Sequence, residues 1–146
     1  MNIALALALG LATVSPTLAI TIPYSDTTEF EVSCDTSEGS PSINDIYKAA
    51  DEVDGKETCD VGNHAFAGSG CSGLKTVGNA KISICQDPGN DASGDKPGIG
   101  CPKVAAMARS LADECPSAGG DKAGGKIDIS VKDHPTLAWI EVSKPS

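Results

Sequence analysis

The sequence predicts a disulfide-stabilised α+β fold in which two helices pack on one face of an antiparallel sheet of four to five strands. This is an α/β sandwich of the ferredoxin-like kind. Three observations predict it. Two segments with helical apolar spacing are interspersed among segments whose apolar residues alternate with polar ones. That alternation is typical of antiparallel sheets with one solvated face. Finally, six cysteines in 146 residues indicate a disulfide framework.

The first segment has the features of a signal peptide. Residues 3–14 are uncharged and almost wholly apolar, and Thr17-Leu18-Ala19 offers small residues for cleavage. This run is shorter than the roughly 20 apolar residues that span a bilayer. We therefore expect residues 1–19 to be removed, which leaves a secreted, extracellular chain without a membrane anchor. Residues 20–29 are expected to form a flexible arm, and residues 30–146 a single domain.

The first strand and the first helix are expected to follow the arm directly. Phe30, Val32 and Cys34 alternate with polar residues and predict a half-buried strand. Ser40 and Pro41 then fit the N-cap and the first residue of a helix. Gly55 ends this helix, whose expected buried face holds Ile43, Ile46, Tyr47, Ala50 and Val53.

The middle of the chain gives a weaker signal because glycines interrupt residues 57–78. A weak hairpin is expected there, with short strands over 58–61 and 74–77. Ala80, Ile82 and Ile84 alternate with polar or cysteine residues and predict a firmer strand, which ends at a turn beginning with Asp87. A polar loop then continues to Gly100.

The last part predicts a second helix and a terminal hairpin. Pro102 opens the helix, Pro116 closes it, and its expected buried face holds Val104, Met107, Ala108, Leu111 and Cys115. Four glycines in residues 117–125 predict a mobile loop. The strands of the hairpin are expected over 127–131 and 137–142, with a turn at 133–136.

All the cysteines follow the signal peptide. An even number of cysteines in a secreted mature chain of about 127 residues predicts three disulfides, although six cysteines allow 15 pairings and the pairing stays open. There is no Cys-x-x-Cys pair, and neither histidine has zinc-finger spacing. We therefore expect no metal site among the cysteines and histidines, and no cofactor. The disulfide residues are Cys34, Cys59, Cys71, Cys85, Cys101 and Cys115.

Charge and aromatic content exclude several ligand classes. A formal net charge of −9 repels nucleic acid and anionic membrane surfaces. Arg109 is the only arginine, which is a poor supply of cations for phosphate chemistry. Trp139, Tyr24 and Tyr47 offer few aromatic platforms for sugars.

The catalytic candidates are few. Only His64 and His134 could serve as imidazole bases, and His134 precedes Pro135 in a predicted turn. General-base chemistry needs an aligned partner, which the sequence does not supply for either residue. The chain also lacks the Gly-x-Ser-x-Gly and His-Glu-x-x-His motifs of hydrolases. We therefore expect no enzymatic activity and assign no catalytic residue.

One acidic loop has oxygen ligands suited to calcium. Asp87, Asn90, Asp91 and Asp95 surround two glycines, but their spacing departs from that of an EF-hand and no closing glutamate follows. A solvated turn and a calcium loop both remain open readings of residues 87–95.

Several segments together carry a resemblance to a known family. They are Ser40-Pro41-Ser42-Ile43-Asn44-Asp45-Ile46, Lys81-Ile82-Ser83-Ile84-Cys85, the helix end Leu111-Ala112-Asp113-Glu114-Cys115-Pro116, and the Gly-Lys-Ile-Asp-Ile-Ser-Val strand that follows. Over residues 34–142 the chain resembles fungal killer-toxin-like secreted proteins, which include smut-fungus killer toxins and effectors of plant-associated fungi. The resemblance implies a small disulfide-bonded α/β sandwich without enzymatic activity. It carries over no site residue, because family toxins tend to be basic and no lysine here matches their exposed lysine.

The expected function is therefore that of a secreted, monomeric effector or toxin-like protein. It would bind a protein or cell-surface target of a host or competitor, in virulence or antagonism. Two alternatives remain: a small secreted hydrolase, and an inhibitor of host hydrolases that uses residues 87–100 as its binding loop. The partner-binding residues and the target are left open.

Overall fold

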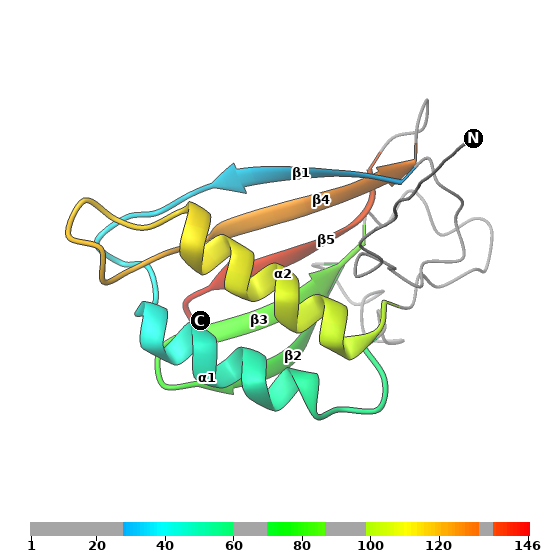
Figure 1. Ribbon diagram of the computed structural model, residues 1–146, viewed down its shortest axis with the longest axis horizontal. Coiled ribbons are helices and arrows are strands. Elements are labelled where there is room, and N and C mark those ends of the chain that lie inside the picture. Colours follow the sequence, from blue (N-terminus) through cyan, green and yellow to red (C-terminus); the bar gives the residue numbers. More distant parts are fainter. Residues whose placement is uncertain (1–27, 60–69, 87–98, 132–135) are drawn as a thin grey trace, which may run out of the picture.

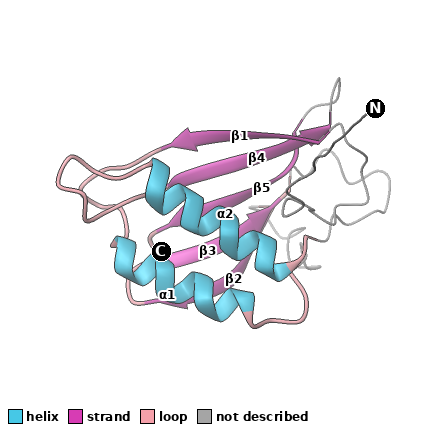
Figure 2. Ribbon diagram, in the orientation of Figure 1, coloured by secondary structure: helices cyan, strands magenta, loops and turns pink. Residues whose placement is uncertain are grey.

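A computed structural model describes residues 28–59, 70–86, 99–131 and 136–146. Within these residues, two helices cover one face of a five-stranded antiparallel sheet, which confirms the predicted α+β class (Figures 1 and 2). In chain order the elements are β1 (Thr28–Cys34), α1 (Ile43–Asp54), β2 (Cys71–Val77), β3 (Ala80–Cys85), α2 (Cys101–Glu114), β4 (Gly125–Val131) and β5 (Thr136–Ser143).

The strands lie in the order β1-β4-β5-β3-β2, and each neighbouring pair is antiparallel. β3 and β4 therefore run in the same direction with β5 between them, and α2 joins them. This is the split β-α-β arrangement of ferredoxin-like folds. β4 and β5 pair as the predicted terminal hairpin, while β1 and β2 lie at opposite edges of the sheet.

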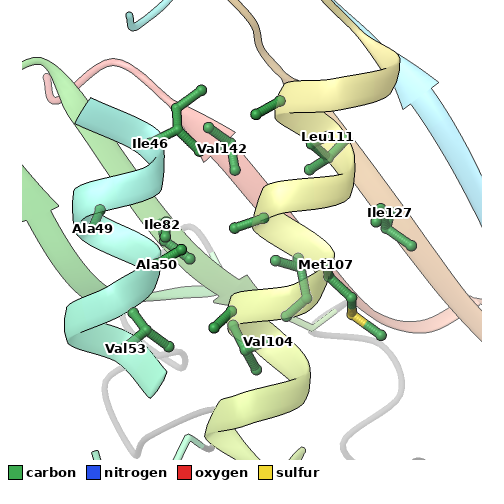
Figure 3. Close-up of a cluster of buried hydrophobic side chains, with 14 of the residues drawn as sticks. Ile46, Ala49, Ala50, Val53, Ile82, Val104, Met107, Leu111, Ile127 and Val142 are labelled. Carbon is green, nitrogen blue, oxygen red and sulfur yellow. The ribbon is translucent and has the colours of Figure 1, made fainter. Parts of the chain in front are cut away.

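The core lies between the helices and the sheet. Its side chains come from the helix faces and from the alternating strand positions that the sequence predicted. Figure 3 shows Ile46 and Val53 of α1 facing Val104 and Leu111 of α2 above the sheet. From the strands, the buried apolar residues are Ile82 and Ile84 of β3, Ile127 and Ile129 of β4, and Ile140 and Val142 of β5. Both helices also bury small residues that the predicted faces omitted: Ala49, Ala105 and Ala112.

The prediction for the start of α1 was wrong by two residues, because Ser42 is the N-cap and not Ser40. The Ser42 hydroxyl accepts a hydrogen bond from the Asp45 amide at 3.2 Å. The Ser42 amide in turn donates to Asn79 Oδ1 at 2.9 Å, and the Asn79 amide donates to Asp45 Oδ2 at 3.1 Å. The turn between β2 and β3 thus supplies hydrogen-bond partners for polar groups at the start of α1.

Ser40 instead stabilises the turn that precedes the helix. Its buried hydroxyl accepts a hydrogen bond from the Ser37 amide at 2.8 Å. The Pro41 carbonyl accepts one from the Ala123 amide at 3.1 Å, which holds Pro41 outside the helix. A long-range contact with residues more than 80 positions away therefore sets the helix start.

The predicted weak hairpin was also wrong, because its second strand pairs with β3. β2 and β3 are joined by Gly78 and Asn79, and Gly78 has φ +55°. Thr58 and Cys59 lie outside any strand, and residues 60 and 61 fall outside the described residues. The Gly-Asn pair between two alternating segments is itself a hairpin signal.

Two further features differ from the sequence prediction. β1 begins at Thr28, so the last two residues of the predicted arm belong to the sheet. Residues 20–27 and the predicted signal peptide lie outside the described residues. The segment predicted to be a mobile loop is hydrogen-bonded: the Ser117 amide donates to the Lys122 carbonyl at 2.7 Å, and the Gly124 carbonyl accepts from the Asp35 amide at 3.0 Å.

Three disulfides join all six cysteines, as predicted, and their pairing is nested. Cys34–Cys115 ties the end of β1 to the C-cap of α2, Cys59–Cys101 ties the segment after α1 to the start of α2, and Cys71–Cys85 crosses the β2–β3 hairpin. Each bridge encloses the next along the chain. Three such bridges are typical of proteins that fold in an oxidising environment.

Candidate functional site

Several sequence candidates fall outside the described residues. They are His64 and His134, the possible calcium ligands over 87–95, and residues 87–98 of the proposed inhibitory loop. Tyr24 lies outside as well.

Arg109 and Tyr47 are used to join the two helices. The Arg109 guanidinium lies 2.6 Å from Asp51 and 3.8 Å from Asp54, both of α1. The Tyr47 hydroxyl donates a hydrogen bond to the Asp113 carboxylate of α2. That bond, together with desolvation and the nearby negative charge, raises the pKa of Tyr47 above its ordinary value near 10. The single arginine is thus neutralised by two carboxylates.

One group of described side chains has the spacing of metal ligands, but its chemistry does not suit a metal. The donor atoms of Cys71, Cys85 and Glu141 lie within 4.8 Å of one another. The two sulfur atoms are bonded to each other, so neither is the thiolate that a metal requires. Glu141 alone remains as a ligand.

The face of the sheet opposite the helices carries Trp139 at its centre. The Lys126 ammonium lies 5.6 Å from the Trp139 ring centroid and 3.0 Å from Asp128. The indole N–H donates to Glu141 at 3.4 Å. A hollow of about 420 Å³ borders this group, lined largely by serines, glycines and charged residues of both signs. Each charge nearest the indole already has a partner within the group.

A second hollow is apolar and lies between β1 and α2; we call it the β1–α2 groove. It measures about 330 Å³. Its sheet side is formed by Phe30, Val32 and Ile127, and its helix side by Lys103, Ala106, Met107, Ser110 and Glu114. The groove therefore has an apolar floor and one charged residue toward each end of its helix wall.

Phe30 is the most unusual residue of this groove. The residue is 40% exposed, and among the residues whose side chains the structure describes no other large hydrophobic residue is as exposed. The cause is topological: β1 is an edge strand, and α2 lies mainly over the strands beside it (Figure 1). The side chain consequently has a neighbour on one side and solvent on the other. Exposed apolar surface with a polar rim is typical of an interaction site.

The two walls of the groove are held together covalently. The Cys34–Cys115 disulfide joins the end of β1 to the end of α2, and both elements run toward it (Figure 1). Glu114 therefore lies at the disulfide end of the groove, and Lys103 lies at the opposite end. This bridge fixes the spacing of the walls before any ligand binds, and preorganisation of that kind favours binding.

Sequence reasoning identified the strand and the helix but missed the groove. It placed Phe30 on the buried face of a strand, which is correct for the face, whereas the edge position depends on the strand order. Glu29 and Glu31 on either side of Phe30 gave one available signal, because charged residues often protect an edge strand from aggregation. Ala106, an apolar residue outside the predicted buried face of the helix, was the other.

The comparisons with known proteins do not identify a family. No protein-family model matches the chain, and no curated protein is significantly similar to it. In the described ranges, neither helix combines the length and the apolar character needed to cross a bilayer.

Proposed function

We propose that this protein is a secreted, non-enzymatic effector or toxin-like protein that acts by binding a protein surface of a host or competitor cell. The observation that carries the proposal is the β1–α2 groove, an exposed apolar hollow whose walls are joined by a disulfide. Small stable domains of this type present a rigid binding surface. A killer-toxin-like ancestry belongs to the same proposal, because a two-layer α+β sandwich with three bridges is the fold that the resemblance implies.

Secretion is supported by two features. The apolar segment of residues 3–14 precedes a small-residue cleavage motif that ends at Ala19, and all six cysteines are paired. The non-enzymatic character is supported by Arg109 and Tyr47, which join the helices and do not stand free for catalysis.

The experiment compares matched variants of the purified secreted protein. Ala106→Arg fills the groove with a long side chain, and Ala118→Arg adds the same residue at another exposed position, in the loop after α2. A third variant, His64→Ala with His134→Ala, removes both imidazoles. The readout is potency in a dose series on plant tissue and on competing fungal cells.

The proposal predicts that Ala106→Arg loses at least tenfold in potency, while Ala118→Arg and the histidine variant stay within twofold of the native protein. Reduction of the disulfides is expected to abolish activity. Loss of activity in the histidine variant, with an unchanged circular dichroism spectrum, would instead support the alternative of a small secreted hydrolase.

A further inference from the structure

We infer that the β1–α2 groove binds an extended segment of its partner as an added strand on the edge of β1, antiparallel to it, with the pattern apolar–basic–apolar. This inference rests on the proposed function and names the partner's chemistry. Three features of the molecule support it: the backbone of β1, the side chains of the groove, and the charges on either side.

The backbone of β1 offers hydrogen-bonding groups at this edge. Asp35 continues the register of β1 with β4, and its amide donates to the Gly124 carbonyl at 3.0 Å. Because N–H groups alternate in direction along a strand, those of Ser33 and Glu31 also point to β4. Those of Phe30 and Val32 point away from the sheet. Within the ranges that the structure describes, no strand pairs with this edge.

The side chains of the same two residues face the groove. Phe30 and Val32 both line it, while Glu31 between them lies on the other face of the sheet. A partner residue paired with Phe30 or Val32 would point its side chain to the same face. An added strand would therefore place apolar side chains over Met107 and Ala106 at every second position.

Charge determines the residue between those two apolar positions. It would lie opposite Glu31, and its neighbour two residues further along would lie opposite Glu29. Opposite charges stabilise directly facing pairs, and like charges destabilise them. The net charge of −9 acts in the same direction. A lysine or arginine is thus the complementary residue.

The sheet itself favours the antiparallel direction. Each neighbouring pair of its strands is antiparallel, and antiparallel pairing is slightly more stable per residue than parallel pairing. An added strand that runs opposite to β1 therefore continues the pattern of the sheet.

A second copy of this chain is a poor occupant. An antiparallel β1–β1 pair that matches Phe30 with Val32 has its twofold axis at Glu31, which sets two carboxylates opposite each other. The other edge of the sheet is also less suitable for strand addition. β2 has a register shift between Gly73 and Lys75, and bulges of that kind protect an edge from pairing.

The test uses the full secreted protein and blocked nine-residue peptides that alternate Val with Lys or Val with Glu. We expect the Lys peptide to bind at least tenfold more tightly than the Glu peptide, with NMR shift changes centred on Phe30 and Val32. N-methylation of the Val amides, which face β1, should abolish binding of the Lys peptide. N-methylation of its Lys amides should preserve it.

Charge reversal on the protein gives an independent readout. Glu31→Lys is expected to weaken binding of the Lys peptide about three- to tenfold and to strengthen binding of the Glu peptide. The matched control Glu57→Lys, in the exposed segment after α1, should leave both affinities within twofold.

Equal affinities for the two peptides, insensitivity to N-methylation of the Val amides, or absence of binding would overturn the strand-addition inference. Absence of binding includes the case in which the chain's own residues or a second copy occupy the edge. If Ala106→Arg still abolishes potency in that case, the proposed function stands without strand addition. If Ala106→Arg leaves potency unchanged, the proposed function itself fails.

Discussion

Removing the outermost disulfide is expected to cost more stability than removing the hairpin disulfide, although both changes delete one bridge. Cys34–Cys115 has a sequence separation of 81 residues, and Cys71–Cys85 one of 14. On the chain-entropy account, a bridge stabilises the protein by restricting the unfolded chain, and the effect grows with the size of the closed loop. The comparison therefore tests whether the size of the loop that each bridge closes determines how much that bridge stabilises the protein.

The nesting reduces the difference between the bridges. With Cys59–Cys101 intact, the loop that Cys34–Cys115 closes shrinks to roughly 40 residues, and the expected contribution is about 4 kcal/mol. The hairpin bridge contributes about 3 kcal/mol. Each value is a large part of the roughly 5–15 kcal/mol by which domains are stable.

The assay is urea unfolding followed by circular dichroism. The double serine variants of Cys34 with Cys115 and of Cys71 with Cys85 are compared with the native protein under oxidising conditions. The first pair should also weaken binding in the groove, since it releases one wall from the other, while the second should leave binding unchanged. A larger stability loss in the hairpin variant, or equal peptide affinity in both, would refute the reasoning.

Three further changes test the fold. Ser42→Ala removes the N-cap of α1 and is expected to cost about 1 kcal/mol in urea unfolding; an unchanged midpoint would contradict the assigned helix start. Gly125→Ala should cost about 2–4 kcal/mol, because φ is +146° and a Cβ would lie 2.3 Å from the Ser33 carbonyl oxygen. Gly120→Ala, where a Cβ meets open space, is its control and should cost about 1–2 kcal/mol. The raised pKa of Tyr47 means that the fold favours the neutral phenol, so this contribution is complete below about pH 10 and is lost as pH rises through the raised value. Urea midpoints measured from pH 8 to 11 should therefore fall less in Tyr47→Phe than in the native protein. An equal fall of the midpoint in both proteins would argue against a stabilising role of the neutral Tyr47 phenol.

Periodicity was sufficient to predict the main elements. The alternation at Ile127, Ile129 and Val131 and the helical spacing from Val104 to Leu111 each describe a local property, namely which side chains share a face. Two helices covering one side of an antiparallel sheet follow from these faces, because each apolar face must be buried.

Long-range contacts decided the features that the sequence did not predict. The start of α1 depends on Asn79 and Ala123, and neither is near Ser42 in sequence. The groove depends on β1 lying at the edge, which follows from the pairing of β4 with both β1 and β5. The disulfide pairing likewise required the fold, since spacing alone allows every combination.

Amide hydrogen exchange of the free secreted protein tests the central claim, that the edge of β1 is open beside an apolar groove. The account predicts alternation along the strand. The amides of Phe30 and Val32 should exchange at rates close to those of unstructured peptides, while those of Glu31 and Ser33, bonded to β4, should be protected at least a hundredfold. Equal protection of all four amides would show that the edge is already covered, and would contradict the assignment of the groove as the binding site.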